Sequence, residues 1–234
     1  LLLSAGQAGA TAPASIAGAV AQAVAEVLAG LVYVNAISPG HPAIVGTWPF
    51  VSDLRTGAMS GGSGEQGLLT AACAQMLQHF DLPAGAASGM ADAKMPDAQS
   101  GYEKGSTAVM AGLAGLNMVY EAAGMHASLL GFCLESLVID NDMLGQCLRC
   151  VRGIDVSDEA LDISVFKDVC LEGPGHYLGH SQTLSLMQSE YIYPGIADRS
   201  SPKEWEELNK PILVEQAAAK IASILKEDTQ GRFS

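Results

Sequence analysis

Short apolar segments alternate with helical segments along this chain, and the alternation limits the folds open to it. The expected strands are residues 1–5, 31–37, 43–47, 82–88 and 126–134. The expected helices are residues 14–29, 65–80, 101–123, 140–152, 159–169 and 212–226. Strands that are apolar on both faces and alternate with helices are typical of a parallel sheet. The sequence therefore predicts an α/β fold, either a closed barrel or a doubly wound sheet.

The net charge of the chain argues against some classes of binding partner. It has 12 Lys and Arg against 25 Asp and Glu, and a formal net charge of −13. Binding to a phosphate backbone requires clustered Lys and Arg, and anionic membrane surfaces attract the same side chains. We therefore expect no nucleic acid and no membrane among the partners, and a small molecule or another protein instead.

Cysteine usage and the N-terminal sequence indicate the compartment. Five cysteines, an odd number in a chain of 234 residues, do not suggest a disulfide framework. The first basic residue is Arg55, so the chain lacks the basic start of a signal peptide. The apolar run at residues 105–134 contains Glu121 and His126, and we interpret it as a buried helix followed by a buried strand. We expect a cytoplasmic protein and, since the chain begins with Leu1, a part of a longer one.

Parallel α/β folds bind ligands at the carboxyl ends of their strands, so the residues after each expected strand are the candidates for chemistry. These residues are Trp48, Asp53, Arg55, Asp92, Lys94, Asp97, Gln99, Tyr102, Glu103, Cys133 and Glu135. The densest group is residues 92–103. Two interpretations stay open for it: a functional loop, or a solvated loop in which Asp97 or Ser100 caps the following helix.

A second group lies in the glycine-rich segment 172–180, which carries His176, Tyr177 and His180. The two histidines are four residues apart, a spacing that would place both on one face of a helix. The surrounding glycines and Pro174 argue against a helix, and further zinc ligands are not found nearby. We therefore expect no metal, and favour ligand contact or a hydrogen bond that fixes the loop.

Two shorter motifs also have a structural interpretation. Residues 60–65 are rich in glycine and precede a helix, where free N–H groups can hold a carboxylate or a phosphate. Capping of that helix by Ser63 accounts for the motif equally well. Cys147 and Cys150 form a single CxxC within an expected helix, and we interpret both as buried small apolar residues.

An ordered series of short motifs resembles the trimethylamine methyltransferase (MttB-like) family. The motifs are GATAP at 9–13, AEVLAG at 25–30, SPGHP at 38–42, DAK at 92–94, DAQ at 97–99, YE at 102–103, GPGHYL at 173–178, His180, Thr183, Pro194, Asp198, Arg199 and Trp205. The series covers nearly the whole chain. A single motif of this kind is weak, but the common order of the set is specific.

The resemblance implies a fold and an activity. The family fold is a (βα)₈ TIM-type barrel, of which this chain would be the C-terminal half with the closing helices. Residues 1–190 would supply βα units and residues 191–234 the C-terminal tail and helix. The family moves a methyl group from a methylated amine to the Co(I) of a corrinoid carried by a partner protein. We therefore expect no tightly bound cofactor, a corrinoid protein as partner, and a homo-oligomer.

The resemblance also implies a branch of the family. Archaeal trimethylamine enzymes carry pyrrolysine, which this sequence does not contain. We place the corresponding position near residues 80–82. The chain thus resembles the branch that demethylates quaternary amines such as glycine betaine. A quaternary ammonium leaves as a neutral tertiary amine, so the reaction needs no general acid and depends on positioning and electrostatics.

Under this resemblance the candidate residues divide into two roles. We expect Asp92, Glu103 and Glu135 to form the catalytic group, which supplies a negative potential near the ammonium. The expected substrate-binding residues are Trp48, Arg55, Gln99, Tyr102, His176, Tyr177 and His180. Aromatic rings among them would face the cation, whereas basic side chains or the amides of residues 60–65 would bind a substrate carboxylate.

Four alternatives remain open from the sequence. The protein could act on trimethylamine itself, or it could bind a betaine without transferring its methyl group. It could also be a structural half-barrel that assembles with a partner half, or a zinc-dependent methyltransferase acting on an alcohol or a thiol. Similarity of fold does not choose among these alternatives.

Overall fold

The structure, a computed structural model, describes residues 1–228. Its centre is a four-stranded sheet in the order β1-β3-β6-β7, in which each neighbouring pair is parallel. The strands are β1 (Leu2–Ser4), β3 (Val45–Thr47), β6 (Ala84–Ala87) and β7 (Met118–Tyr120). The expected α/β class with a parallel sheet is therefore confirmed. The described residues form an open sheet, and the closed barrel stays a prediction.

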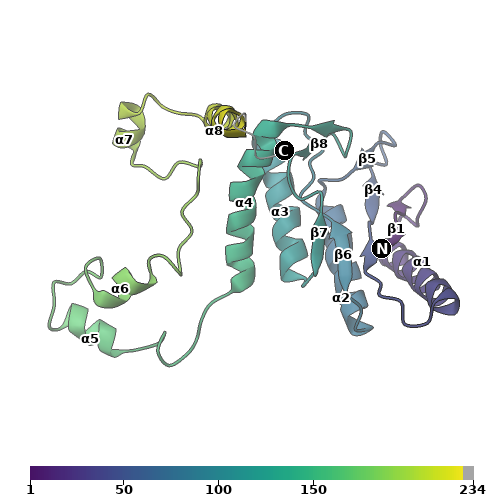
Figure 1. Cartoon of the computed structure of the whole chain (residues 1–234), viewed down its shortest axis with the longest axis horizontal. Coiled ribbons are helices and arrows are strands. Elements are labelled where there is room, and N and C mark those ends of the chain that lie inside the picture. The colour runs from purple at the N-terminus through teal and green to yellow at the C-terminus, as the bar shows by residue number, and fades with distance from the viewer. Residues whose placement is uncertain (229–234) are drawn as a thin grey trace.

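Helices separate the strands and cover one face of the sheet (Figure 1). They are α1 (Ile16–Ile37), α2 (Gly64–His79), α3 (Ala98–Leu113) and α4 (Leu134–Arg152). α1 and α2 pack on the strands, α3 packs on α2, and α4 packs on α3. One apolar cluster between the sheet and the first two helices consists of Val27, Val45, Leu77 and Ala84, all almost fully buried. Burial of such side chains is the main favourable contribution to folding.

Short strands continue the chain beyond the carboxyl ends of the parallel sheet. β2 (Gln7–Ala8), β4 (Phe50–Ser52) and β5 (Met59–Ser60) form a small mixed sheet. β8 (Met125–His126) and β9 (Gly131–Phe132) form an antiparallel hairpin after β7. Loops from four βα units are therefore gathered at this edge of the sheet.

After α4 the chain extends away from the sheet as an arm and then returns (Figure 1). The arm carries α5 (Ser164–Cys170), α6 (Ser181–Leu186) and α7 (Pro202–Glu207). α8 (Leu213–Asp228) ends the described chain and packs on α4. The expected tail 191–234 thus contains α7 and α8, and its last six residues lie outside the described part.

Most expected elements are confirmed within a few residues. β1, β3 and β6 lie within the expected strands 1–5, 43–47 and 82–88. α2 and α8 match the expected helices 65–80 and 212–226 closely, and segment 172–180 is a loop. The helix expected at 159–169 is shorter and shifted, because α5 begins only at Ser164.

The strand expected at residues 31–37 is wrong, because these residues form the last turns of α1. Their β-branched residues Val32 and Val34 favour a strand. However, the sequence has no strong helix stop until Ser38, whose N–H donates to the carbonyl of Val34 at 2.8 Å. The strand propensity of these residues is therefore outweighed by the continuation of helix α1.

Two expectations after residue 100 are also wrong. The helix expected at 101–123 ends with α3, since Gly115 takes a positive φ of 80° and β7 follows. The strand expected at 126–134 is a hairpin followed by the first residue of α4. Cys133 caps α4 through its Sγ, so this helix begins six residues before the expected residue 140.

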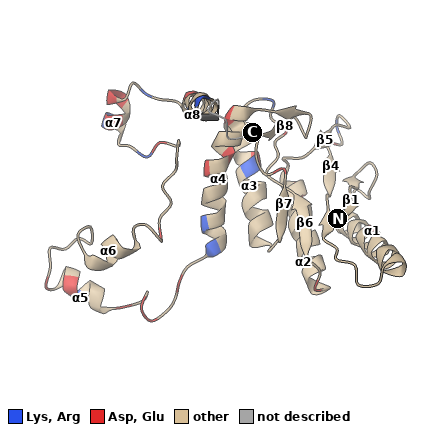
Figure 2. Cartoon of the chain, viewed as in Figure 1, with Lys and Arg blue, Asp and Glu red and all other residues tan. Residues whose placement is uncertain are grey.

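Helix α1 is long and apolar enough to span a membrane by length and composition alone. In the structure it packs on β1, β3 and α2, with Ala19, Ala23, Val24 and Val27 buried. Figure 2 shows few charged residues on α1 and on the strands. A weakly charged helix is expected where its small side chains approach a sheet closely.

A buried ion pair joins α3 to α4. Lys104 Nζ lies 2.6 Å from Asp140 Oδ2, and the two side chains are 1% and 5% exposed. The N–H of Gly124 donates to the same carboxylate oxygen at 2.7 Å. The pair therefore also fixes the segment that follows β7.

We predict that Asp140→Ala lowers the free energy of unfolding by about 3–5 kcal/mol, because it leaves the Lys104 ammonium buried without a counter-charge. Glu190→Ala is the control, since Glu190 pairs with Arg149 nearer the surface and its loss should cost about 0–1 kcal/mol. Urea unfolding of both variants measures the difference. Equal losses would contradict the role given to the buried pair.

Candidate functional site

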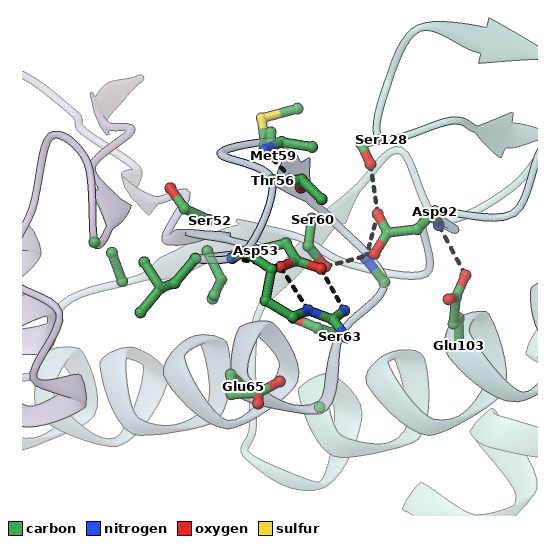
Figure 3. Close-up of a pocket in the computed structure, with 18 of the residues that line it drawn as sticks. Ser52, Asp53, Thr56, Met59, Ser60, Ser63, Glu65, Asp92, Glu103 and Ser128 are labelled. Atoms are coloured by element: carbon green, nitrogen blue, oxygen red, sulfur yellow. Dashed lines mark hydrogen bonds and ion pairs between the residues drawn. The ribbon is translucent and has the colours of Figure 1, made fainter.

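A cavity of about 970 Å³ lies at the carboxyl edge of the sheet. Its lining comes from the segment after β2, the loop between β4 and β5, the N-terminus of α2, the loop between β6 and α3, α3 itself and the β8–β9 hairpin. Each of these segments follows a strand of the sheet or extends from one. Figure 3 shows their side chains converging on the space between them.

The carboxylate of Asp92 connects three of these segments (Figure 3). The hydroxyl of Ser60 donates to Oδ2 at 2.5 Å, and the hydroxyl of Ser128 donates to Oδ1 at 2.5 Å. The N–H groups of Gly61 and Gly62 donate to Oδ1 at 2.8 and 3.4 Å. Asp92 thus ties the β5–α2 loop and the β8–β9 hairpin to its own loop.

These donors also determine the charge of Asp92. Burial alone raises the pKa of this carboxyl, but the hydrogen bonds from Ser128, Ser60 and the two glycine amides outweigh it and lower the pKa below its ordinary value. Hydrogen bonds to the charged form favour that form. Asp92 is therefore ionised at neutral pH and places a fixed negative charge in the wall of the cavity.

Glu103 supports the same loop from α3. Its Oε2 accepts hydrogen bonds from the N–H groups of Asp92 at 2.8 Å and of Ala93 at 3.2 Å, and its Oε1 accepts one from Gln99 Nε2 at 2.8 Å. A Cβ at Gly62 would lie 2.9 Å from Glu103 Oε2 and 3.0 Å from the nitrogen of Asp92. A glycine at this position therefore allows the two loops to meet.

The hairpin that carries Ser128 has an unusual backbone. Ala127, Ser128 and Leu129 have φ values of 49°, 51° and 78°, in the left-handed region that disfavours residues other than glycine. The N–H groups of Ala127 and Ser128 donate to the carbonyls of Ala93 and Ala91 at 3.0 Å each. Together with the contact of Ser128 with Asp92, these bonds hold the turn against the cavity.

Two basic side chains border the cavity. Arg55 pairs with Asp53 at 2.6 Å, and the hydrogen bond from its guanidinium lowers the pKa of Asp53 to about 2. Lys94 Nζ donates to the backbone carbonyl of Asp92 at 2.7 Å. The border thus offers positive charge close to the fixed carboxylates.

The structure places four of the expected site residues in the lining of the cavity, namely Arg55, Asp92, Tyr102 and Glu103. Gln99 contacts it indirectly, through Glu103. Glu135 lies in the first turn of α4, where its own N–H and the thiol of Cys133 lower its pKa. Trp48 lies against Tyr120, with ring centroids 5.5 Å apart.

The other three expected residues lie on the arm. His176 follows α5 and is exposed, and Tyr177 lies 3.3 Å from Cys170 Sγ. His180 caps α6 by accepting the N–H of Gln182. In Figure 1 α4 stands between this part of the arm and the sheet, so the fold does not bring these residues to the cavity.

The capping interpretations left open by the sequence are confirmed. Asp97 caps α3 in a capping box with Ser100, and Ser63 caps α2. Cys147 is buried as expected, but Cys150 is exposed, so that half of the interpretation is wrong. Residues 1–228 contain no group of three or more His, Cys, Asp or Glu side chains arranged to hold a metal ion.

Sequence reasoning misses Ser60, Ser128 and Tyr120. The sequence marks Ser60 only as part of a glycine-rich turn, and the other two lie inside segments assigned to the wrong element. Ser128 is hard to identify from the sequence, because a single serine within an apolar segment forms no recognisable motif. Tyr120 lies at a strand end, where a correct assignment of β7 would mark it.

Sequence comparison places the chain among known proteins. The family described as trimethylamine methyltransferase (MTTB) matches residues 1–233. The chain is 35% identical over 199 residues to a glycine betaine methyltransferase of Desulfitobacterium hafniense (strain Y51), covering 85% of this chain and 41% of that protein. It is 34% identical over 225 residues to trimethylamine methyltransferase MttB of Methanosarcina thermophila, covering 96% and 46%. The chain spans less than half the length of the curated relatives it matches.

We predict that Ser128→Ala lowers the free energy of unfolding by about 1.5–3 kcal/mol, because it removes a hydrogen bond to an ionised carboxylate. Ser106→Ala is the matched control, since Ser106 lines the same cavity and makes a 3.3 Å bond within α3. Urea unfolding compares the two. A loss from Ser106→Ala as large as that from Ser128→Ala would refute the role of Asp92 as the link between loops.

Proposed function

The chain belongs to the trimethylamine methyltransferase family, and from this premise we propose that it forms part of an enzyme that demethylates an amine. The enzyme moves a methyl group from a methylated amine to the Co(I) of a corrinoid that a partner protein carries. The observation that carries the proposal is the family match over residues 1–233. The cavity at the carboxyl edge, with an ionised Asp92 in its wall, supports it.

We propose a quaternary amine of the glycine betaine type as the substrate. The similarity to a glycine betaine methyltransferase and the lack of pyrrolysine in residues 1–234 support this choice. The similarity to trimethylamine methyltransferases is almost as high, at 34%, and makes trimethylamine the second candidate.

The reaction is a displacement at carbon. The electron pair of Co(I) forms the new bond to the methyl carbon, and the electrons of the C–N bond leave with nitrogen as a neutral tertiary amine. No proton is transferred, so no acid or base is required. The protein must hold the cation with one methyl group aimed at cobalt, and such orientation is a large source of rate.

The described residues fit this task in two ways. Asp92 and Glu103 supply negative potential from positions fixed by hydrogen bonds, and Glu135 adds charge from the start of α4. Because the ammonium loses its charge as the bond breaks, this potential favours binding of the substrate more than the chemical step. Trp48 and Tyr102 offer rings to the cation.

A substrate carboxylate would bind at the basic border of the cavity. Arg55, which pairs with Asp53, and the N-terminus of α2 lie on this border. The amides of Gly61 and Gly62 already donate to Asp92. Gln99 would act by holding Glu103. His176, Tyr177 and His180 would take part only if the arm approached the cavity.

The remaining parts of the proposal concern the assembly. We propose that the chain supplies the C-terminal half of a (βα)₈ barrel, as its four parallel strands and its share of the relatives' length suggest. A corrinoid protein is the proposed partner, the compartment is the cytoplasm, and the enzyme is a homo-oligomer.

The test is methyl transfer to chemically reduced cobalamin by the complete enzyme of which this chain is proposed to form part, measured as the absorbance change from Co(I) to methyl-Co(III). The donors are glycine betaine, proline betaine, carnitine, choline and trimethylamine. We expect a signal with a carboxylated quaternary amine. A signal with trimethylamine alone would select the second candidate, and no signal from the folded protein with any donor would contradict the proposed activity.

Arg55→Gln refines the same test. We expect this variant to raise the KM for glycine betaine by up to about fivefold, the effect of losing one exposed charge contact worth at most about 1 kcal/mol, and to leave the KM for choline unchanged. Arg152→Gln is the control, because Arg152 lies at the end of α4 and pairs with Glu190. Equal effects of Arg55→Gln on both donors would count against a carboxylate site at the border.

A further inference from the structure

The face of the sheet opposite α1 and α2 is open and has little side-chain bulk in its middle. Val45 and Ala84 pack toward the helices, so the next residues, Gly46 and Gly85, face the other way. These two glycines are paired neighbours in β3 and β6. Leu3, which lies over Gly46, is 50% exposed, so this inner face is accessible.

Two aromatic side chains meet on this inner face at its carboxyl end. Trp48 is two residues beyond Gly46, and its backbone N–H donates to the carbonyl of Ser4 at 2.7 Å, which continues the strand pairing. Tyr120 ends β7 on the other side of β6. Their ring centroids are 5.5 Å apart and their planes are tilted by 43°.

Gly85 makes room for this pair. A Cβ at Gly85 would lie 2.1 Å from the hydroxyl oxygen of Tyr120 and 2.7 Å from its Cζ. Any side chain at position 85 would therefore displace the phenol ring. The glycine lets Tyr120 lie across β6 and reach Trp48.

The polar atoms of this group lack partners within residues 1–228. Trp48 Nε1, Tyr120 OH and Oε2 of Glu121, the next residue in the chain, are covered and make no hydrogen bond. Phe50 packs edge-on against Trp48, with centroids 6.4 Å apart and planes at 89°. Both Trp48 and Tyr120 are only half-buried, so part of each ring stays available. What the pair offers to a ligand is aromatic surface rather than hydrogen bonds.

We propose that Trp48 and Tyr120, backed by Phe50 and followed by the carboxylate of Glu121, form the seat for the trimethylammonium group of the amine. The proposal rests on the proposed function for the class of amine. It assigns specificity to residues outside the lining of the cavity around Asp92. The ligand it requires is a cation with an apolar surface, since the accessible part of the seat is aromatic ring and its unpartnered polar atoms are covered.

The physical reason is the attraction between a cation and the faces of aromatic rings, which is strongest for tryptophan. A methylated ammonium has a diffuse charge and an apolar surface, so the free-energy cost of removing its hydration shell is small when it enters such a seat. Burial raises the pKa of the neighbouring Glu121 carboxyl, so this group adds attraction where a bound cation favours its ionised form. A neutral molecule of the same shape gains only the apolar contact.

The experiment measures binding without methyl transfer. The probe is choline, compared with 3,3-dimethyl-1-butanol, in which carbon replaces the charged nitrogen. The protein carries Trp205→Phe, so that Trp48 is the only tryptophan of residues 1–234 and reports binding by fluorescence. We expect choline to change the Trp48 emission with a Kd at least threefold lower than that of the neutral alcohol. Equal affinities, or choline binding measured by calorimetry without a change in Trp48 emission, would overturn the proposal.

Substitutions at single residues test where the cation binds. Tyr120→Leu and Gly85→Ala should each raise the Kd for choline about threefold to thirtyfold, the range of a lost cation–π contact, and Tyr120→Phe should keep the affinity. Glu121→Gln should raise the Kd as well. Tyr33→Leu is the control, because Tyr33 is an exposed tyrosine on α1. Loss of affinity in Tyr102→Leu but not in Tyr120→Leu would overturn the assignment.

Binding of choline and methyl transfer to cobalamin test the aromatic seat and the enzymatic activity separately. Choline binding at Trp48 without methyl transfer to cobalamin would refute the enzyme but keep the seat. Methyl transfer whose KM is unchanged in Tyr120→Leu and Gly85→Ala would keep the enzyme and refute the seat. The comparison of choline with its neutral analogue needs no variant in the seat, so it decides the question even where a variant does not fold.

Discussion

The carboxylate of Asp92 joins the loops at the carboxyl edge of the central sheet. It accepts hydrogen bonds from Ser60, Ser128 and two backbone amides, and these donors keep it ionised. The loops it joins belong to different βα units. Hydrogen bonds to a charged acceptor are stronger than hydrogen bonds to a neutral one. The shape of the cavity therefore depends on this group.

The packing behind the cavity supports the same group. Glu103 fixes the loop of Asp92 from α3, and the buried pair of Lys104 and Asp140 fixes α3 to α4 and to the segment after β7. The left-handed turn with Ser128 is held by bonds to that same loop. These bonds preorganise the site, which suits the proposed reaction, in which a cation is oriented and no proton is transferred.

The parallel sheet and several elements are predictable from the sequence, because a short, uniformly apolar run such as residues 82–88 is typical of a strand covered on both faces. Prediction fails between residues 101 and 134. There a short strand follows a helix after a glycine, and a hairpin depends on contacts with residues 91–93 that are distant in the sequence. Of the polar residues at 92–103, Asp92 and Glu103 lie in the lining of the cavity. Their partners and the pairing of Trp48 with Tyr120 arise only from the fold.

The central claim is that a methylated ammonium binds at the carboxyl edge of the sheet, within the negative potential of Asp92, and gives its methyl group to cobalt. The most direct measurement is single-turnover methylation of reduced cobalamin by glycine betaine, comparing the native protein with Asp92→Asn over a range of betaine concentrations. The account predicts methyl-Co(III) formation in the native protein, and half-saturation in the variant at about tenfold higher betaine, the cost of one lost charge interaction. No methyl-Co(III) in the native protein, or an unchanged half-saturation in a folded Asp92→Asn variant, would contradict it.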